Sequence, residues 1–299
     1  MPRLQLVLTF LLASMFARAA PPAPPPPQVI HYLAGQKQND TRFTYYWDLL
    51  AAALKATDTP RSTIVAQATD REMSLARAES EVASGGMLDV MARTTSQSLE
   101  SHLLPIRIPL DKGLTGFRIF AVREDMQASF SAVNNLDDLR KLRIGLGRSW
   151  ADVPILRNAG LTVVEGEDYA GLFRMLRAGR FDGLSRGVNE IGEELRQQGD
   201  ATPKLVMERH LLLYYPLPRY FFVSRTPQGQ ALAARITEGL RRLEASGEFE
   251  QRYRAYKKAV LANLALHGRT LIRIPNPTLS PETPLGDASA WDDLSTELK

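Results

Sequence analysis

Short apolar runs alternate along the chain with longer segments of helical periodicity, and this alternation predicts strands followed by helices. Residues 29–34 (VIHYLA) form the first apolar run, which is typical of a buried strand. Residues 43–56 then place Trp47, Leu50 and Leu54 along one side, as an amphipathic helix does. The same alternation predicts strands over 62–68 and 88–92 and a helix over 74–83. Strands separated by helices favour a parallel sheet with right-handed crossovers.

A second set of alternating elements occupies the middle of the chain. The pattern predicts strands over 142–147, 161–166 and 181–185 and helices over 151–159 and 167–180. The helix over 167–180 is the clearest, because Asp168 can cap its first turn and Gly179 can end it. Two β-α-β sets of similar size predict an α/β protein with two lobes, each a mostly parallel sheet flanked by helices.

Two long apolar stretches lie outside both sets, at 115–123 (TGFRIFAVR) and 214–225 (YYPLPRYFFVSR). The first leads into the second set, and the other leads back towards helices expected over 229–243 and 247–261. We interpret both stretches as crossovers that form a hinge; the alternative is that both are core strands of one sheet. The expected parts are a first lobe of residues 29–117 and 223–264, a second lobe of residues 118–222, and a partly disordered C-terminal extension of residues 265–299.

The N-terminus carries a signal of its own. Residues 4–16 are mostly apolar after a positive start, and the sequence up to Ala19 fits a cleavage site, so residues 1–19 are predicted to be a secretory signal peptide cleaved after Ala19. A membrane anchor is the alternative, but the 13 residues of this run fall short of the ~20 that cross a bilayer. A proline-rich spacer of residues 20–28 follows. The style of the signal indicates a periplasmic protein.

Composition and motifs exclude several kinds of site. The 299 residues include no cysteine, which excludes disulfides, thiolate metal sites and cysteine nucleophiles. The formal net charge of +4 falls to +2 when removal of the signal peptide takes away Arg3 and Arg18, which is too little to indicate nucleic acid. The four histidines lack metal-ligand spacing, and P-loop and GxSxG motifs are missing. We therefore expect a monomer without metal, cofactor or enzymatic activity, although catalytic residues can assemble from distant positions.

Six segments follow one another in an informative order. They are LDVMARTTS, IPLDKGLTGFRIFAV, DLRKLRIGLGRSW, LFRMLRAGRFDGL, LPRYFFVSR and GLRRLEASGEFEQRYRAY. Their order and spacing resemble the type II periplasmic solute-binding proteins, in particular the substrate-binding components of polar amino-acid ABC transporters. The resemblance spans about residues 29–264. It implies two lobes that close over a small ligand bound between them.

Two ligand-clamp positions differ from that family. Its amino-acid binders usually carry a TxxR arginine for the ligand carboxylate, whereas the stretch ARTTSQSLES has no arginine after Thr95 until Arg107. They also usually carry an aspartate for the ligand ammonium, where this sequence has Arg186 and Gly187. The resemblance therefore implies the fold and the mode of binding, but not an ordinary amino acid as the ligand.

Candidate ligand contacts follow the ends of strands, because ligands bind beyond the carboxyl ends of strands in open α/β sheets. The expected contacts are Arg42, Arg71, Arg93, Thr94, Thr95, Gly147, Ser149, Arg186 and Gly187. Guanidinium groups suit carboxylate or phosphate, and helix N-termini behind Ser149 and Gly187 would add N–H donors. We hypothesise that Arg186 holds an anionic group in the cleft; the alternative is that it pairs with Asp182 or Glu190 on the surface.

The expected function is that of a periplasmic solute-binding protein for ABC-type import, with a small polar ligand that the arginines indicate to be anionic. The alternative is a ligand-sensing partner of a signalling receptor, since the same fold serves both roles. The expected partners are the ligand and either an ABC permease or a membrane sensor, and no nucleic acid.

Overall fold

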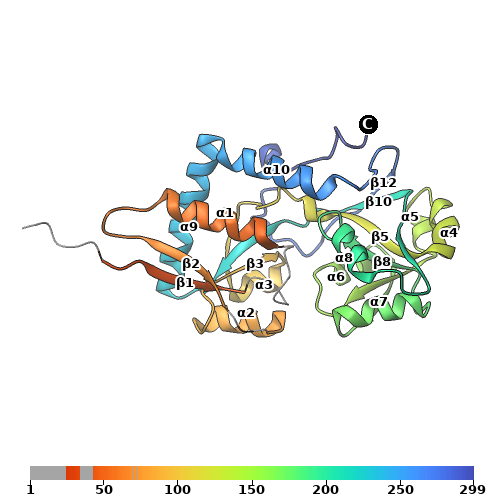
Figure 1. The fold of residues 1–299 in the computed structure, drawn as a ribbon, viewed down its shortest axis with the longest axis horizontal. Helices are drawn as coiled ribbons and strands as arrows, with labels where there is room; N and C mark the ends of the chain where they lie inside the picture. The colour runs from red at the N-terminus through yellow and green to blue at the C-terminus, as the bar shows by residue number, and fades with distance from the viewer. Residues whose placement is uncertain (1–24, 34–42, 70, 72) are drawn as a thin grey trace, which may run out of the picture.

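Two β-sheets, each covered by helices, form the cores of two lobes that follow one another along the long axis of the molecule (Figure 1). The computed structural model describes residues 25–33, 43–69, 71 and 73–299. The signal peptide expected over residues 1–19 and its cleavage site after Ala19 lie outside the described residues, as does the first part of the proline-rich spacer.

The sheet of the first lobe has five strands in the order β2-β1-β3-β11-β4. They are β1 (Gln28–Tyr32), β2 (Ile64–Ala68), β3 (Val90–Thr94), β4 (Leu104–Ile106) and β11 (Arg219–Val223). The first three strands run parallel, whereas β11 is antiparallel to β3 and β4. The expectation of a mostly parallel sheet is confirmed here, because among these five strands β11 alone runs in the opposite direction, since it returns from the other lobe and enters the sheet from the opposite end.

Helices cover both faces of this sheet. They are α1 (Thr44–Ala56), α2 (Leu75–Ser84), α3 (Gln97–His102), α9 (Pro227–Ser246) and α10 (Glu248–Leu261). Helices α1 and α9 share one core with the sheet, which buries Leu50 and Ile236, while α2 and α3 share another, which buries Leu99. Gly239 lets α9 approach α1 closely, because a Cβ at this position would overlap the carbonyl oxygen of Ala53.

The sheet of the second lobe has seven strands in the order β12-β10-β5-β8-β6-β7, with β9 paired to β5. They are β5 (Phe117–Arg123), β6 (Arg143–Gly147), β7 (Thr162–Gly166), β8 (Gly183–Gly187), β9 (Leu205–Met207), β10 (Leu211–Tyr214) and β12 (Thr270–Arg273). Strands β6, β7 and β8 run parallel, whereas β5 is antiparallel to β8, β9 and β10. This sheet is also mostly parallel, because β12 runs with β10 and, among these seven strands, the crossover strand β5 alone runs in the opposite direction.

Five helices cover the second sheet. They are α4 (Gln127–Ser131), α5 (Leu136–Leu139), α6 (Asp152–Asn158), α7 (Tyr169–Arg177) and α8 (Ile191–Gln198). Short 3₁₀ helices within the described residues are η2 (Leu114–Gly116), η3 (Glu124–Met126) and η4 (Ala288–Ala290). Asp168 caps α7, as predicted, by accepting a hydrogen bond of 2.6 Å from the N–H of Gly171. Helices α4, α5 and α6 share one core with the sheet, and α7 and α8 share another.

Two of the crossovers between the lobes touch each other. The first runs through η2 into β5, and the second comprises residues 215–218 between β10 and β11. The N–H of Tyr215 donates to the carbonyl oxygen of Gly116 at 3.3 Å, and a Cβ at Gly116 would overlap the carbonyl oxygen of Tyr215. Only glycine fits at this contact. The two-lobed fold with two crossovers is therefore confirmed.

The lobe boundary differs from the expected one at the second crossover. Residues 219–222 were expected in the second lobe, but they belong to β11 and pair with β3 of the first sheet. The stretch 214–225 is therefore divided between two sheets. Pro216 and Pro218 explain the division, because proline has no N–H to donate to a ladder and ends the pairing of β10.

The C-terminal extension belongs to both lobes. Its strand β12 pairs with β10 of the second sheet. The chain then reaches the first lobe, where the N–H of Gln97 donates to the carbonyl oxygen of Thr278 at 2.8 Å. It finally returns to α10 and buries Leu294 fully in the core that α7 and α8 share. We name residues 276–299 the C-terminal strap; against the expectation of partial disorder, the strap is packed along both lobes.

Candidate functional site

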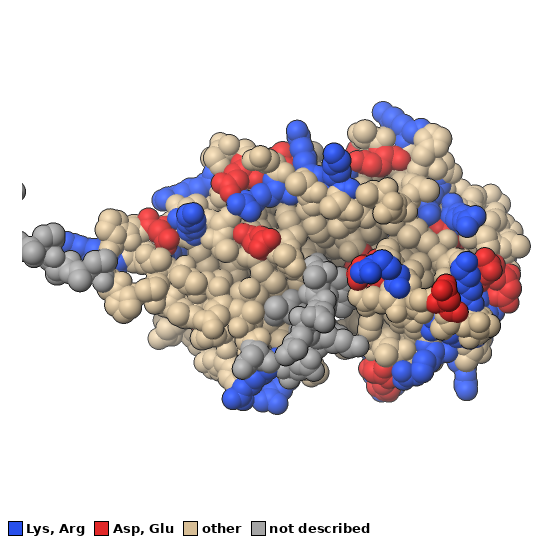
Figure 2. All heavy atoms as spheres, viewed as in Figure 1, with Lys and Arg blue, Asp and Glu red and all other residues tan. Residues whose placement is uncertain are grey.

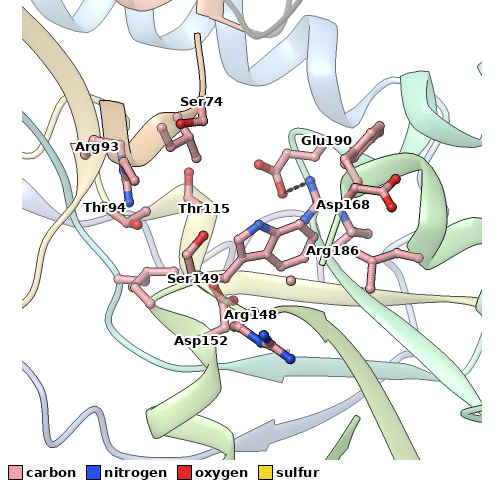
Figure 3. A pocket seen from close by; sticks show the side chains of 18 of the residues that line it. Ser74, Arg93, Thr94, Thr115, Arg148, Ser149, Asp152, Asp168, Arg186 and Glu190 are labelled. Atoms are coloured by element: carbon pink, nitrogen blue, oxygen red, sulfur yellow. Dashed lines mark ion pairs between the residues drawn. The ribbon is translucent and has the colours of Figure 1, made fainter. Parts of the chain in front are cut away.

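A cavity of about 440 Å³ lies between the two lobes, where strands of both sheets end (Figure 3). Ser74, Arg93 and Thr94 gather on one side of it in Figure 3, and Arg186 and Glu190 lie on the other. The polar and charged residues that line it are Ser74, Arg93, Thr94, Thr115, Arg118, Arg148, Ser149, Asp152, Glu167, Asp168, Tyr169, Arg186, Glu190 and Arg219. Its place beyond the ends of β3, β6 and β8 is the one that open α/β sheets favour for ligands.

Arg93 and Arg219 approach the cavity from opposite faces of the first sheet. In the antiparallel pair of β3 and β11, Arg93 lies opposite Tyr220 and Arg219 lies opposite Thr94. Because paired residues share a face and successive residues alternate, the two arginine side chains leave the sheet on different faces. Both line the cavity, because they lie at the edge where β3 ends. Two guanidinium groups therefore flank the end of one strand.

Within the described part of the chain, each of these guanidinium groups has one buried nitrogen atom that donates no hydrogen bond. The Nη1 atom of Arg93 lies 3.8 Å from Glu79 Oε2, is buried and makes no hydrogen bond. Arg219 donates through Nη1 to the carbonyl oxygen of Ala92 at 3.4 Å, while its buried Nε has no hydrogen-bond partner. Buried donors normally have partners. An anion at this edge of the sheet would accept from both groups.

Both arginines are cations despite their burial. Burial lowers the pKa of Arg93, the Glu79 carboxylate offsets part of this effect, and the Arg219 guanidinium lowers it further. Burial also acts to lower the pKa of Arg219, but the influence of Tyr46 and Asp111 outweighs it and the pKa is raised. Guanidinium pKa values start so high that both groups keep their charge at neutral pH. The first-lobe wall therefore presents two positive charges.

Arg186, in β8, is held by carboxylates of its own lobe. Its Nε and Nη2 atoms each donate to a carboxylate oxygen of Glu194 at 2.5 Å, and Nη2 lies 3.0 Å from Glu190 Oε2. The guanidinium group also lies 4.3 Å from the centre of a Trp150 ring. The side chain is buried rather than on the surface. Arg186 thus lines the cavity, as expected, but its charge already has partners inside the protein.

Gly187, the next residue, does not offer its N–H to the cavity. This N–H donates to Glu190 Oε2 at 3.0 Å, and a Cβ at Gly187 would lie 3.1 Å from the same oxygen. Glu190 Oε2 also lies 3.9 Å from Arg118 Nη1. The N–H of Gly187 therefore has its partner in the same lobe, and Gly187 does not line the cavity.

Arg118 and Asp152 form a buried ion pair in the second-lobe wall. Arg118 Nη2 lies 2.6 Å from Asp152 Oδ1, and the hydroxyl of Tyr215 donates to the same oxygen at 2.5 Å. Burial raises the pKa of the Tyr215 hydroxyl well above its ordinary value, so this group remains a donor. The carboxylate of Asp152 is therefore fixed by two neighbours before any ligand enters.

Trp150 forms a neutral part of the same wall. Gly147 at the end of β6 makes room for it, because a Cβ at Gly147 would lie 2.5 Å from Trp150 Nε1. Arg148, which follows Gly147, is largely exposed and pairs with Glu167 at 2.5 Å. The end of β6 thus contributes an aromatic surface to the cavity, with a paired arginine beside it.

The structure brings together five of the nine contacts expected from the sequence. Those that line the cavity are Arg93, Thr94, Gly147, Ser149 and Arg186. Thr95 is fully buried and donates to Glu100 Oε1 at 2.6 Å, and Arg71 is exposed and does not line the cavity. Gly187 is also not a lining residue, and Arg42 lies outside the described residues.

Sequence reasoning missed Arg118, Asp152 and Arg219. Arg118 and Arg219 each stand in an otherwise apolar strand, FRIFAV and RYFFV, where a charged residue is rare unless it is paired. This interruption of an apolar run is the signal that could have found both. Asp152 gave no such signal, because acids are common in the first turn of a helix.

Two other kinds of site find no support in the part of the chain that the structure describes. There, no three His, Asp or Glu side chains gather in a way that could hold a metal ion. None of the helices there has the length and apolar character needed to cross a membrane. Figure 2 shows Lys and Arg mixed with Asp and Glu over both lobes, and this face carries no continuous basic stripe.

Comparisons with solved structures identify the fold. The arginine-specific periplasmic binding protein of Salmonella typhimurium matches with a TM-score of 0.52 and 17% identity, over 76% of this chain and 98% of that one. The VFT2 domain of Bordetella pertussis BvgS matches with a TM-score of 0.52 and 16% identity, over 77% and 92%. The substrate-binding protein of an amino acid ABC transporter matches with a TM-score of 0.50 and 12% identity, over 78% and 100%.

These likenesses define the class of fold. The chain has the two-lobed α/β fold of the type II periplasmic binding proteins, which confirms at the level of the fold the resemblance stated from the sequence. No family model matches the sequence, and no curated protein matches it either. Identities below 20% carry the fold alone, so the ligand has to be argued from the cavity.

Proposed function

We propose that the protein binds a small solute with an anionic group between its two lobes, in the periplasm, and passes it to an ABC-type importer. The neighbouring folds support the binding role, since they include periplasmic binding proteins and the substrate-binding protein of an amino acid ABC transporter. The cavity of about 440 Å³ is within the range that small-molecule sites occupy. The signal peptide expected over residues 1–19 supports the location.

The observation that carries the anionic ligand is the pair of first-lobe arginines. Arg93 and Arg219 both lie at the end of β3, and each has a buried nitrogen atom with no hydrogen-bond partner among the described residues. A carboxylate or phosphate oxygen between them would receive charge-assisted hydrogen bonds from a wall already in place. This moves the proposed anion contact from Arg186, which Glu194 occupies, to the opposite lobe.

The charged groups of the second-lobe wall support binding rather than catalysis. Asp152 contacts Arg118 at 2.6 Å, and Glu190 contacts Arg186 at 3.0 Å. Guanidinium groups of the same lobe engage both carboxylates, whereas a general acid or base has to reach a proton of the substrate. The proposed role is therefore non-enzymatic, with a monomer acting as the carrier of the solute.

The alternative function is ligand sensing for a membrane receptor. The VFT2 domain of BvgS and a histidine kinase sensor domain with similarity to periplasmic binding proteins share the fold. Deletion of the gene separates the two roles. Import requires that uptake of the solute falls in the deletion strain, whereas sensing requires that uptake continues and a solute-dependent response disappears.

A thermal-shift screen of the refolded protein tests solute binding itself. The panel holds amino acids, mono-, di- and tricarboxylates, phosphorylated compounds, polyamines and sugars. A ligand at about 100 times its dissociation constant adds about 2.7 kcal/mol of stability, which moves the unfolding midpoint by a few degrees. No shift with any compound would contradict the proposed function.

The variants Arg93→Gln and Arg219→Gln then test the anion contact. Both should reduce the shift that an anionic ligand causes. Arg235→Gln is the matched control, because the side chains of Arg235 and Arg93 are both 16% exposed and Arg235 pairs with Asp58 in the first lobe without lining the cavity. If the anionic ligand raised the unfolding midpoint of both cavity variants as much as that of the natural protein, the anion would bind elsewhere.

A further inference from the structure

We propose that the solute is a monocarboxylate with an apolar or aromatic body and no ammonium group. This inference rests on the solute-binding function proposed above, and it names the chemistry of the ligand. It follows from three features of the cavity, which are the charge available at the first-lobe wall, the pairing of the acids in the second-lobe wall, and the neutral surface between them.

The first-lobe wall has room for about one negative charge. Arg93 and Arg219 bring two positive charges to the end of β3. Glu79 lies 3.8 Å from Arg93, and the buried Asp111 acts on Arg219. These acids already offset part of the positive charge, and they would repel a doubly charged phosphate more strongly than a carboxylate. A single carboxylate, with two oxygens in one plane, matches two guanidinium groups that approach from opposite faces of the sheet.

The acids of the second-lobe wall are engaged by arginines. Asp152 accepts from Tyr215 and pairs with Arg118, and Glu194 is paired with Arg186 through both its oxygens. The guanidinium groups of Arg118 and Arg186 thus bind Asp152, Glu190 and Glu194. The other two acids that line the cavity pair with different arginines, Glu167 with Arg148 and Asp168 with Arg174.

Glu190 follows Arg186 and Gly187, which stand where the resembled family usually carries an aspartate for the ligand ammonium, and it lies between two cations. Its Oε2 is 3.0 Å from Arg186 Nη2 and 3.9 Å from Arg118 Nη1, and it also accepts from the N–H of Gly187. An ammonium group at Glu190 would lie beside both guanidinium groups and would be repelled by them. The wall therefore disfavours the charge that distinguishes an amino acid from the corresponding carboxylic acid.

The surface between these walls is apolar or aromatic. Phe43, Met73, Trp150, Leu172 and Leu217 line the cavity. The Arg186 guanidinium stacks on Trp150, and this contact, together with the ion pair to Glu194, keeps the indole in place. A pre-formed aromatic wall suits a flat or branched hydrocarbon body.

Two matched sets of compounds test the inference by titration calorimetry on the refolded protein. The first set is 3-phenylpropionate, L-phenylalanine and 2-phenylethylamine, and the second is 4-methylpentanoate, L-leucine and 3-methylbutylamine. Within each set, the body stays the same while the carboxylate and ammonium groups change. We expect each acid to bind about tenfold or more tightly than its amino acid, and each amine not to bind. Phenylphosphonate, tested beside the first set, should bind more weakly than 3-phenylpropionate.

Variants show whether binding uses the proposed wall. Arg219→Gln and Arg93→Gln should each reduce the affinity for 3-phenylpropionate by about tenfold or more, whereas the affinity of Arg235→Gln should stay within about twofold of that of the natural protein. Arg219→Lys keeps the charge and loses the planar fork, so it should weaken the acid less than Arg219→Gln. Unfolding curves of each variant confirm that the comparison is made on folded protein.

The outcomes separate this inference from the proposed function. Tighter binding of the amino acids than of the acids would overturn the monocarboxylate and leave solute binding intact. Binding of sugars or polyamines, with none of the carboxylates, would also overturn it while solute binding stands. Failure of every compound in the sets and in the wider panel would overturn both.

Discussion

Arg186 and Glu194 form a bidentate ion pair inside the second lobe, in which two guanidinium nitrogens each lie 2.5 Å from a carboxylate oxygen and both side chains are buried. The pair joins β8 to α8, and the same guanidinium stacks on Trp150. Arg186 therefore positions the aromatic wall of the cavity from behind, while the first-lobe arginines remain to meet a ligand.

Replacement of Arg186 by methionine should destabilise the protein. Arg186→Met leaves the Glu194 carboxylate buried with one of its partners lost, and breaking a buried pair in this way costs about 3–5 kcal/mol. Chemical denaturation measures the change.

The double variant Arg186→Met with Glu194→Leu removes both charges and should recover most of the loss. The control is Arg196→Met on α8, the helix that carries Glu194. The Arg196 side chain is 75% exposed, and its replacement should change stability by no more than about 0.5 kcal/mol. A loss for Arg186→Met as small as that of the control would contradict the importance of the pair.

The pairing of Arg186 with Glu194 also shows what the sequence could and could not predict about the site. The end of β8 and the helix after it follow from local patterns, so the position of Arg186 beside the cavity could be predicted. Its partner could not, because Glu194 is eight residues away on a helix whose orientation depends on how it packs on the sheet. An arginine in a strand-end loop looks the same in sequence whether its partner is a ligand or a buried carboxylate.

The same distinction holds for the fold: features set by neighbouring residues could be predicted from the sequence, and features set by distant residues could not. Asp168 caps α7 as predicted, because the cap and the N–H that it accepts from lie three residues apart. The stretch 214–225 was predicted as one extended segment, yet its first residue, Tyr214, ends β10 of one sheet and its residues 219–223 form β11 of the other. Strand partners such as Val90 and Val223 lie 133 residues apart along the chain, and periodicity carries no information about which sheet a strand joins.

Asn189 links the lobes, and its replacement by alanine should favour an open form. Its Nδ2 atom donates to the hydroxyl of Tyr46 at 3.2 Å and to the hydroxyl of Tyr256 at 2.9 Å, and both tyrosines belong to first-lobe helices. Each hydrogen bond contributes about 0.5–1.5 kcal/mol, so Asn189→Ala should shift the balance between closed and open forms by about 1–3 kcal/mol. Small-angle scattering should then report a larger radius of gyration for the ligand-free variant.

The matched control for this latch is Asn134→Ala. Asn134 is also in the second lobe, but it is exposed and its side chain donates only to the carbonyl oxygen of Ala132. Its replacement should leave the radius of gyration unchanged. Equal radii of gyration and equal solute affinities for Asn189→Ala and Asn134→Ala would show that Asn189 does not hold the lobes together.

Two helical glycines should respond to alanine in opposite directions. A Cβ at Gly239 would overlap the carbonyl oxygen of Ala53, so Gly239→Ala must push α9 away from α1 and should cost about 3 kcal/mol, near the upper end for overpacking. At Gly192, in α8, the nearest atom to such a Cβ is Leu264 Cδ2 at 3.9 Å. Gly192→Ala should therefore gain about 0.5–1 kcal/mol from helix propensity. Urea denaturation of both variants measures the difference, and equal effects would show that the α1–α9 contact is looser than described.

Asp292 anchors the C-terminal strap to α10, and its contribution to stability should depend on pH. Lys257 Nζ lies 2.7 Å from Asp292 Oδ2, and the hydroxyl of Tyr253 donates to the same oxygen at 2.7 Å. Burial acts to raise the pKa of Asp292, but these contacts and the N–H of Leu294 outweigh it and hold the pKa below its ordinary value. A carboxyl group with a lowered pKa stabilises the folded state above its unfolded pKa of about 3.9, and loses this effect as the pH falls through the folded value.

Asp292→Asn should therefore be less stable than the natural protein at neutral pH, with a difference that shrinks as the pH falls below about 3.9. Urea denaturation of both proteins over this pH range measures the difference. The control is Asp293→Asn, because Asp293 is exposed and its side chain accepts from the N–H of Ser295 within the strap rather than from α10. Its effect should be small at every pH. If the Asp292→Asn difference stayed constant down to the acid end, the ion pair with Lys257 would contribute nothing, and the strap would be held by Leu294 and its apolar neighbours alone.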